Sequence, residues 1–160
     1  MRVKASWLPW LSCLTVGLFY CYEMMQLTLI NTISVSLVKS LHLSVAELSS
    51  LSSIYLYACA AAILPAGLLL DRYALKPLLL ITLGLAVIGA FITANASQLW
   101  QAMLGRALTG FSCDFAFLGY FTLVSKYFTG RIATFARSMI YSLGALGCIL
   151  SQAPVTLLLQ

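Results

Sequence analysis

The stretch GLLLDRYALKP, which runs from Gly67 to Pro77, is a short charged gap between two long apolar segments. It holds the adjacent pair Asp71 and Arg72, and Lys76 follows one helical turn later. A helix needs about 20 mostly apolar residues to cross the hydrocarbon core of a bilayer. The segments on either side are close to that length. The stretch therefore indicates a loop that joins two membrane helices.

The composition of the whole chain also indicates a protein embedded in a lipid bilayer. Of the 160 residues, 62% are hydrophobic and only 8% are charged, and the mean hydropathy is +1.00. A soluble domain does not need so much apolar material for its core. The gaps between the apolar segments are too short to hold a second domain. We therefore predict an all-α, polytopic helix bundle that forms a single membrane domain over residues 1–160.

About five membrane helices are predicted from the apolar segments and the residues that flank them. The second helix begins at a capping box formed by Ser44 and Glu47. Pro77 fits the first turn of the third helix, where its missing N–H is harmless. The end of the first helix is poorly marked because polar residues follow it. The predicted spans are residues 7–30, 47–70, 77–94, 98–127 and 132–159.

Basic residues fall mainly in alternate gaps, which predicts the orientation of the chain. Lys and Arg in short loops are retained on the cytoplasmic side of a membrane. The opposite gaps hold only Lys39 and the lone His42. The amino terminus is therefore predicted to be cytoplasmic, and the net charge of +5 reflects topology and not nucleic-acid binding. The basic pairs that carry this prediction are Arg2 with Lys4, Arg72 with Lys76, and Lys126 with Arg131.

The basic start followed by an apolar run is also typical of a secretory signal, and Leu11-Ser12-Cys13 resembles a lipoprotein cleavage site. The run continues too far for a signal, and Trp10 stands where such a site has an aliphatic residue. We expect an uncleaved first helix. All five cysteines fall within predicted spans, where free cysteine packs as a small hydrophobe. Their spacing suggests no disulfide and no metal site, and no cofactor is expected.

The gap between the second and third spans resembles the signature loop of the major facilitator superfamily. That family pattern is a glycine, three residues, Asp-Arg, any residue, a second glycine and then basic residues. Gly67, Asp71, Arg72 and Lys76 match it, whereas alanine replaces the second glycine and leucine replaces the first basic residue. The resemblance implies a conformational latch between helix ends, in a loop whose turn and charge network these replacements would weaken. The alternative is that Arg72 and Lys76 only set the topology.

Two further segments carry the same resemblance. LGRALTG at residues 104–110 is similar to the fourth-helix segment that holds a buried arginine in the family. SLGALGCILSQAP at residues 142–154 is similar to the Gly-rich fifth helix. A typical member has about twelve helices in two halves. The five predicted spans therefore suggest an amino-terminal fragment, for which the missing carboxy-terminal helices or a partner chain would be needed for transport.

Ionisable residues inside the predicted spans are the candidates for function. A charge at membrane depth costs at least about 2.5 kcal/mol, so each should find a partner or line a wet cavity. Depths estimated at about 1.5 Å per residue predict two ion pairs across helices. These are Glu23 with Arg106 and Asp114 with Arg137. The alternative is that the pairs only hold the helices together.

Other polar residues fall beside these charges at helical spacing, on one stripe of the first span and one of the fifth. The resemblance implies that the first and fourth helices border a central substrate cavity. The candidate residues for binding the substrate or coupling to protons are Glu23, Arg106, Asp114, Arg137, Tyr20, Asn31, Tyr141 and Gln152.

The function implied by the resemblance is secondary active transport of a small solute by alternating access, coupled to protons as a symport. Arg106 and Arg137 are candidates for binding an anionic group, and Glu23 or Asp114 for carrying the proton. The alternative is a truncated, non-transporting membrane protein, either a remnant or an assembly subunit. An enzyme is not expected, because no metal-ligand cluster or nucleophile motif is present.

The short gaps between spans favour a bacterial inner (plasma) membrane. Asn95-Ala96-Ser97 nevertheless spells an acceptor pattern for N-glycosylation close to the end of the third span. The source of the chain is therefore a prediction that rests on loop length.

Overall fold

The computed structural model describes residues 7–41 and 44–158, and these residues form an all-α bundle. Within them there are helices and short connections and no strand, which confirms the predicted fold class. The helices are α1 (Trp7–Leu41), α2 (Val45–Arg72), α3 (Leu75–Ala94), α4 (Leu99–Tyr127) and α5 (Gly130–Leu158).

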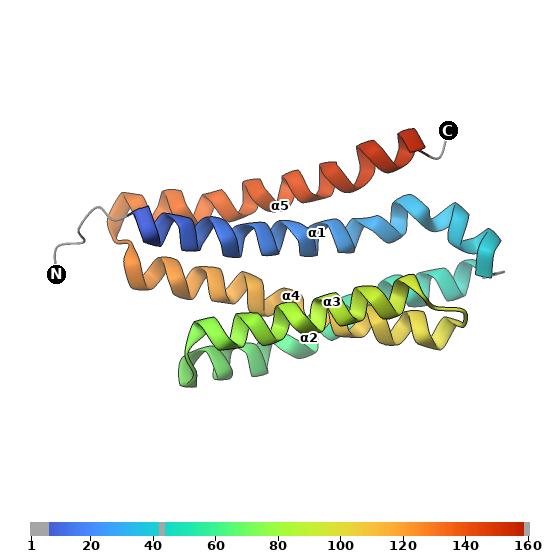
Figure 1. Cartoon of the computed structure of the whole chain (residues 1–160), viewed down its shortest axis with the longest axis horizontal. Helices are drawn as coiled ribbons and strands as arrows, with labels where there is room; N and C mark the ends of the chain where they lie inside the picture. The colour runs from blue at the N-terminus through green and yellow to red at the C-terminus, as the bar shows by residue number, and fades with distance from the viewer. Residues whose placement is uncertain (1–6, 42–43, 159–160) are drawn as a thin grey trace.

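The central element of the bundle is α4. Figure 1 shows α1 and α5 running side by side in the same direction, with α4 crossing obliquely between this pair and the remaining two helices. Both α2 and α3 pack mainly on α4, and they touch each other little. The first helix packs mainly on α5 and then on α4. Side chains from three different helices can therefore meet on α4.

Four helices in the described part of the chain, α2 to α5, are long and apolar enough to cross a membrane. The first helix is not among them, although Figure 1 shows it running along most of the length of α5. Its sequence includes the buried carboxylate of Glu23. A charged residue lowers the apolarity of a segment strongly.

The first helix is longer than the predicted first span. Residues 31–41 continue it without a break, through the polar residues that made its end poorly marked in the sequence. Thr28 Oγ1 donates to Met24 O at 3.0 Å, and Thr32 Oγ1 donates to Thr28 O at 3.4 Å. Such bonds satisfy hydroxyl groups within the helix itself. Polar residues of this kind therefore need not mark a helix end.

The predicted start of α2 is confirmed. Ser44 N–H donates to Glu47 Oε2 at 2.8 Å, and Glu47 N–H donates to Ser44 Oγ at 3.3 Å. The other end of α2 turns sharply into α3 through Tyr73 and Ala74. Ala74 has φ −64° and ψ 134°, which any residue adopts. The loop turn therefore needs no glycine at this position.

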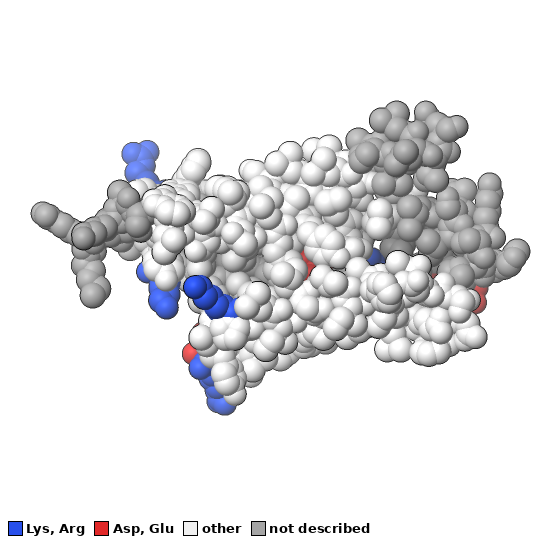
Figure 2. Space-filling view, in the orientation of Figure 1, with Lys and Arg blue, Asp and Glu red and all other residues white. Residues whose placement is uncertain are grey.

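Among the residues whose side chains the structure describes, basic side chains gather at one end of the molecule. Figure 2 shows Lys and Arg mainly at the end where α2 turns into α3 and α4 turns into α5. The connections from α1 to α2 and from α3 to α4 lie at the opposite end. The gaps predicted to be basic therefore lie together at one end of the bundle, and the gaps predicted to have few basic residues lie at the other end.

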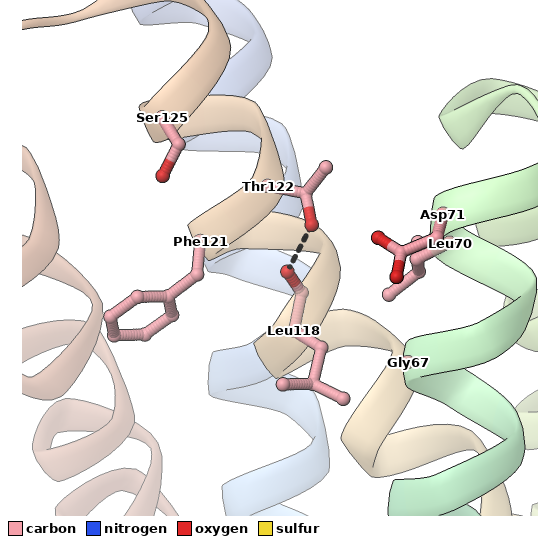
Figure 3. Close-up of a pocket in the computed structure, with 7 residues that line it drawn as sticks. All are labelled: Gly67, Leu70, Asp71, Leu118, Phe121, Thr122 and Ser125. Atoms are coloured by element: carbon pink, nitrogen blue, oxygen red, sulfur yellow. Dashed lines mark hydrogen bonds between the residues drawn. The ribbon is translucent and has the colours of Figure 1, made fainter.

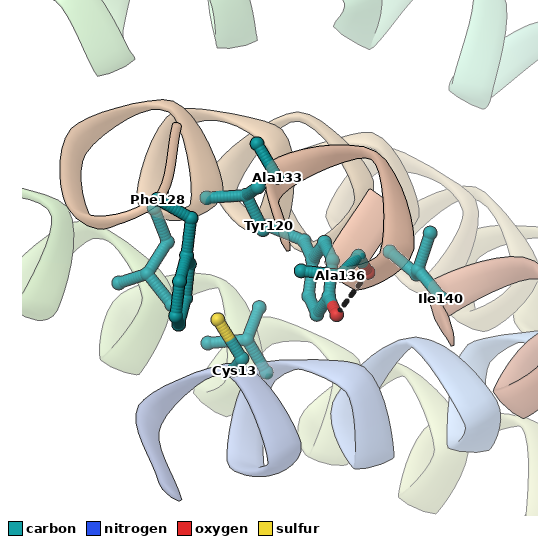
Figure 4. Packing of buried hydrophobic residues seen from close by; sticks show 9 residues of the cluster. Cys13, Tyr120, Phe128, Ala133, Ala136 and Ile140 are labelled. Atoms are coloured by element: carbon teal, nitrogen blue, oxygen red, sulfur yellow. Dashed lines mark hydrogen bonds between the residues drawn. The ribbon is translucent and has the colours of Figure 1, made fainter. Parts of the chain in front are cut away.

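A packed cluster joins α1, α4 and α5 near the basic end (Figure 4). Cys13 and Tyr120 are fully buried in it. The Tyr120 hydroxyl donates to the Ala136 carbonyl at 2.7 Å, so the polar tip of this large ring is satisfied inside the bundle. This cluster packs α1, α4 and α5 against one another.

Candidate functional site

Glu23 is the most deeply buried carboxylate among the described residues, with 0% of its surface exposed. It lies on α1 and faces α4, where the Ser112 hydroxyl lies 2.7 Å from Glu23 Oε1. The same hydroxyl lies 2.7 Å from the Thr109 carbonyl. Glu23 Oε2 is buried and has no hydrogen-bond partner in the described part of the chain. A carboxylate in such a place is expensive to keep ionised.

Arg106 is buried on the same helix as Ser112, and it is 2% exposed. Its Nη1 donates to the backbone carbonyl of Gln26 on α1 at 2.6 Å. Its guanidinium carbon lies 4.5 Å from the centre of the Tyr55 ring on α2. This distance allows a cation–π interaction. Arg106 Nε is buried without a hydrogen-bond partner among the described residues.

A close contact between α2 and α4 places the Tyr55 ring beside Arg106. A Cβ atom added to Gly110 would overlap the backbone carbonyl of Tyr55, so only glycine permits this approach. Cys59 Sγ donates to the Gly110 carbonyl at 3.1 Å in the same contact. The Tyr55 hydroxyl reaches across to the Glu23 carbonyl at 3.4 Å. The three helices α1, α2 and α4 thus meet around one polar cluster, formed by Glu23, Tyr55, Arg106, Thr109 and Ser112.

The predicted association of Glu23 with Arg106 is partly realised. Both residues belong to this polar cluster and are electrostatic neighbours. In the described part of the chain, however, no direct ion pair joins them, because Ser112 binds the carboxylate and Gln26 binds the guanidinium. The guanidinium of Arg106 therefore attracts the Glu23 carboxylate without touching it, and it binds α1, the helix that carries Glu23, at the Gln26 carbonyl.

The predicted ion pair between Asp114 and Arg137 is not formed. Arg137 is exposed on α5 and its Nη2 donates to Ser125 Oγ at 3.2 Å. Ser125 lies about 16 Å along α4 from Asp114. The depth estimate failed because α4 has 29 residues, so it is about 43 Å long and extends beyond a core of about 30 Å. Residue counts from helix ends then no longer report membrane depth.

The structure brings together two of the remaining candidates, Tyr20 and Tyr141. Tyr20 and Tyr141 meet on the ring of Phe117, with centroid distances of 5.4 and 6.1 Å. Gln152 is exposed on α5. Asn31 lies within α1, but its side chain is outside the part that the structure describes.

The signature loop lies beside an open pocket at the basic end. Gly67 and Asp71 on α2 face Phe121, Thr122 and Ser125 on α4 across a space of about 390 Å³. Figure 3 shows the Asp71 carboxylate directed into this space toward α4. Arg72 and Lys76 are exposed at the same end.

Tyr55, Thr109 and Ser112 were missed as site residues by sequence reasoning. Ser112 follows Arg106 and Thr109 at a spacing of three residues, so a search for polar residues on one face of the fourth span would have included it. Tyr55 carried no such signal, because its contact with Arg106 depends on the approach of two helices at Gly110.

Comparisons with known proteins agree with this architecture. A family model described as Major Facilitator Superfamily matches residues 16–159. A curated protein from Aspergillus terreus, named an MFS-type transporter, is 31% identical over 101 residues. The match covers 63% of this chain and 18% of that protein, and no solved structure matches the chain. Because the family model covers α2 to α5 entirely and most of α1, this chain belongs to the major facilitator superfamily.

Proposed function

We propose that the chain is part of a secondary transporter that moves a small solute by alternating access and couples this movement to protons. Membership of the family supports a role in transport and favours a transporter over an enzyme. The activity of the whole protein is part of the proposal, because the chain spans 18% of the curated relative's length. The five helices, including α1, would then belong to a larger set of membrane helices.

The arrangement around Ser112 is the observation that carries the proposal of proton coupling. A hydroxyl has one proton to donate and two lone pairs to accept. When Glu23 is ionised, Ser112 donates to its carboxylate. When Glu23 is protonated, it donates to Ser112 Oγ, and the Ser112 proton turns to the Thr109 carbonyl. Both distances are 2.7 Å, so both protonation states of Glu23 have hydrogen bonds.

Arg106 supplies the opposing charge in this proposal. It is engaged by the Gln26 carbonyl and covered by the Tyr55 ring. Because its guanidinium is already engaged in this way, Arg106 is better placed to stabilise ionised Glu23 than to contact a solute. Protonation of Glu23 would remove that attraction and leave Arg106 held only by α1 and α2. A change in helix contacts could then follow the proton.

The signature loop and the orientation complete the proposal. Asp71 opens onto the pocket beside α4 and would act with Gly67, Arg72 and Lys76 as the latch at the basic end. The basic end would be cytoplasmic, together with the amino terminus. Integral, multi-pass membrane placement follows from the helices and the family. A bacterial inner membrane gains no support from the comparisons, since the curated relative is fungal.

The test uses the complete native protein in liposomes that contain a fluorescent pH probe. A panel of small solutes is added, and proton entry driven by each solute is recorded. The variant Glu23→Gln should abolish solute-driven proton entry while leaving solute exchange without a gradient intact. Glu47→Gln is the matched control, because it makes the same chemical change at an exposed helix start.

Either of two results would contradict the proposal. One is normal proton-coupled uptake by Glu23→Gln. The other is full biological activity after Glu23 and Arg106 are neutralised together. The second result would favour the alternative, a membrane protein that keeps these helices for assembly and does not transport.

A further inference from the structure

Asp114 is a carboxylate in the bundle that the proposed proton chemistry does not use. It lies on α4 and is half-buried, and its Oδ2 is buried with no hydrogen-bond partner in the described part of the chain. Its electrostatic neighbours include Glu23 and the hydroxyl of Tyr20. Arg106 is already engaged beside Glu23, and Arg137 is held at Ser125. Among the described residues, the charge of Asp114 is therefore left without a nearby cation.

Aromatic residues share the face of α4 that carries Asp114. Phe117 and Phe121 follow Asp114 at helical spacing and share its face. Their ring centroids are 4.9 Å apart, and Figure 3 shows the Phe121 ring directed away from α2 and toward α5. Tyr141 on α5 lies 6.1 Å from the Phe117 ring and 6.4 Å from the Phe121 ring. Tyr20 on α1 adds a fourth ring, 5.4 Å from Phe117.

This aromatic face is partly exposed. Tyr141 is 58% exposed, and Tyr20, Phe117 and Phe121 are all only partly buried. Phe121 also lines the open pocket that extends toward Asp71. An apolar organic cation that carries aromatic groups could therefore contact several rings at once while it approaches the carboxylate.

The geometry points to a binding site for an organic cation, formed by Asp114 with Tyr20, Phe117, Phe121 and Tyr141 between α1, α4 and α5. Aromatic faces attract cations through their negative quadrupole, and an unpaired carboxylate in a poorly solvated place attracts the same charge. Anions and neutral polar solutes gain neither interaction. The inference rests on the proposed function, since it names the class of solute for that transporter.

Binding of tetraphenylphosphonium to the complete protein in detergent micelles tests the inference, with tetraphenylborate as a probe of the same shape and opposite charge. The cation should bind at least about tenfold more tightly than the anion. Asp114→Asn should weaken cation binding about tenfold, whereas Asp114→Glu should retain most of it. Phe121→Ala should weaken it several-fold.

Phe111 provides the matched aromatic control. It lies on the same helix and packs on Phe115 at 5.5 Å, in a separate cluster that faces α2 and α3. Phe111→Ala should leave cation binding unchanged. Equal binding of the two ions, or cation binding that Asp114→Asn does not change, would overturn the inference.

The binding measurement separates this inference from the proposed function, because it uses neither a membrane nor a gradient. Binding that depends on Asp114 without any transport would support the cation site and contradict the transporter. Coupled transport of a solute, together with no Asp114-dependent binding of the cation, would support the transporter and overturn the cation site.

Discussion

Replacing Gly147 with alanine should weaken the contact between α1 and α5. A Cβ atom at this position would overlap the Cys21 carbonyl oxygen and would lie 3.1 Å from the carbonyl carbon and 3.2 Å from Cys21 Sγ. The oxygen belongs to a helical backbone and cannot move alone. The two helices must therefore separate, and a gap of about 0.5–1 Å already forfeits a quarter to a half of each dispersion contact.

The expected loss of stability is about 1–3 kcal/mol, the usual result of forcing a methyl group into a packed interface. Alanine also favours a helix over glycine by about 0.5–1 kcal/mol, which offsets part of that loss. The net effect should be about 0–2.5 kcal/mol of destabilisation. It can be measured as the free energy of unfolding in mixed micelles of detergent and SDS.

Gly84→Ala is the matched control for this measurement. Gly84 lies in the interior of α3, and an added Cβ would meet no atom within 4 Å. The same substitution should there be neutral or stabilise the protein by up to about 1 kcal/mol. If Gly147→Ala is as stable as Gly84→Ala, within about 0.5 kcal/mol, the contact between α1 and α5 is not as tight as described.

Three further perturbations test other contacts. Gly110→Ala should destabilise the bundle by about 1–3 kcal/mol, because it separates α2 from α4; unfolding in SDS measures this, and unchanged stability would argue against the close approach. Ser44→Ala should lower stability by about 1 kcal/mol by removing the capping box; hydrogen exchange in the first turn of α2 should increase, and unaltered exchange would count against the cap. Tyr120→Phe should lower stability by about 0.5–1.5 kcal/mol, since it removes the bond to the Ala136 carbonyl; no change would mean that this bond contributes nothing net.

The charged loop and the buried arginine were recognised from sequence because they are local patterns. The capping box at Ser44 depends on residues within one turn, and the structure forms it as predicted. Arg106 falls in a short motif within an apolar span, and it is buried as expected. Local hydrogen bonding and the penalty for charge in a bilayer leave few alternatives at such positions.

Pairing between helices was much harder to predict. Asp114 and Arg137 were expected to form an ion pair, but helix length beyond the bilayer core made their depths unreliable. Ser112 and the Gln26 carbonyl stand between the charges of Glu23 and Arg106, and neither role was predicted. Which residue of a neighbouring helix a side chain meets depends on the crossing angle between the two helices and on the rotation of each helix about its own axis. Those quantities depend on contacts such as that between Gly110 and the Tyr55 carbonyl.

Sequence by itself determined that this is a helical membrane protein of the major facilitator superfamily, together with the approximate ends of α2 to α5. Apolar length, caps and basic residues act along the chain, so their effects can be read without a fold. Only the tertiary structure decided that Glu23, Tyr55, Arg106 and Ser112 form one cluster, and that Asp114 lies apart from Arg137. Those groupings arise because close packing of five helices on one another brings distant residues together, and the geometry of that packing is a property of the whole bundle.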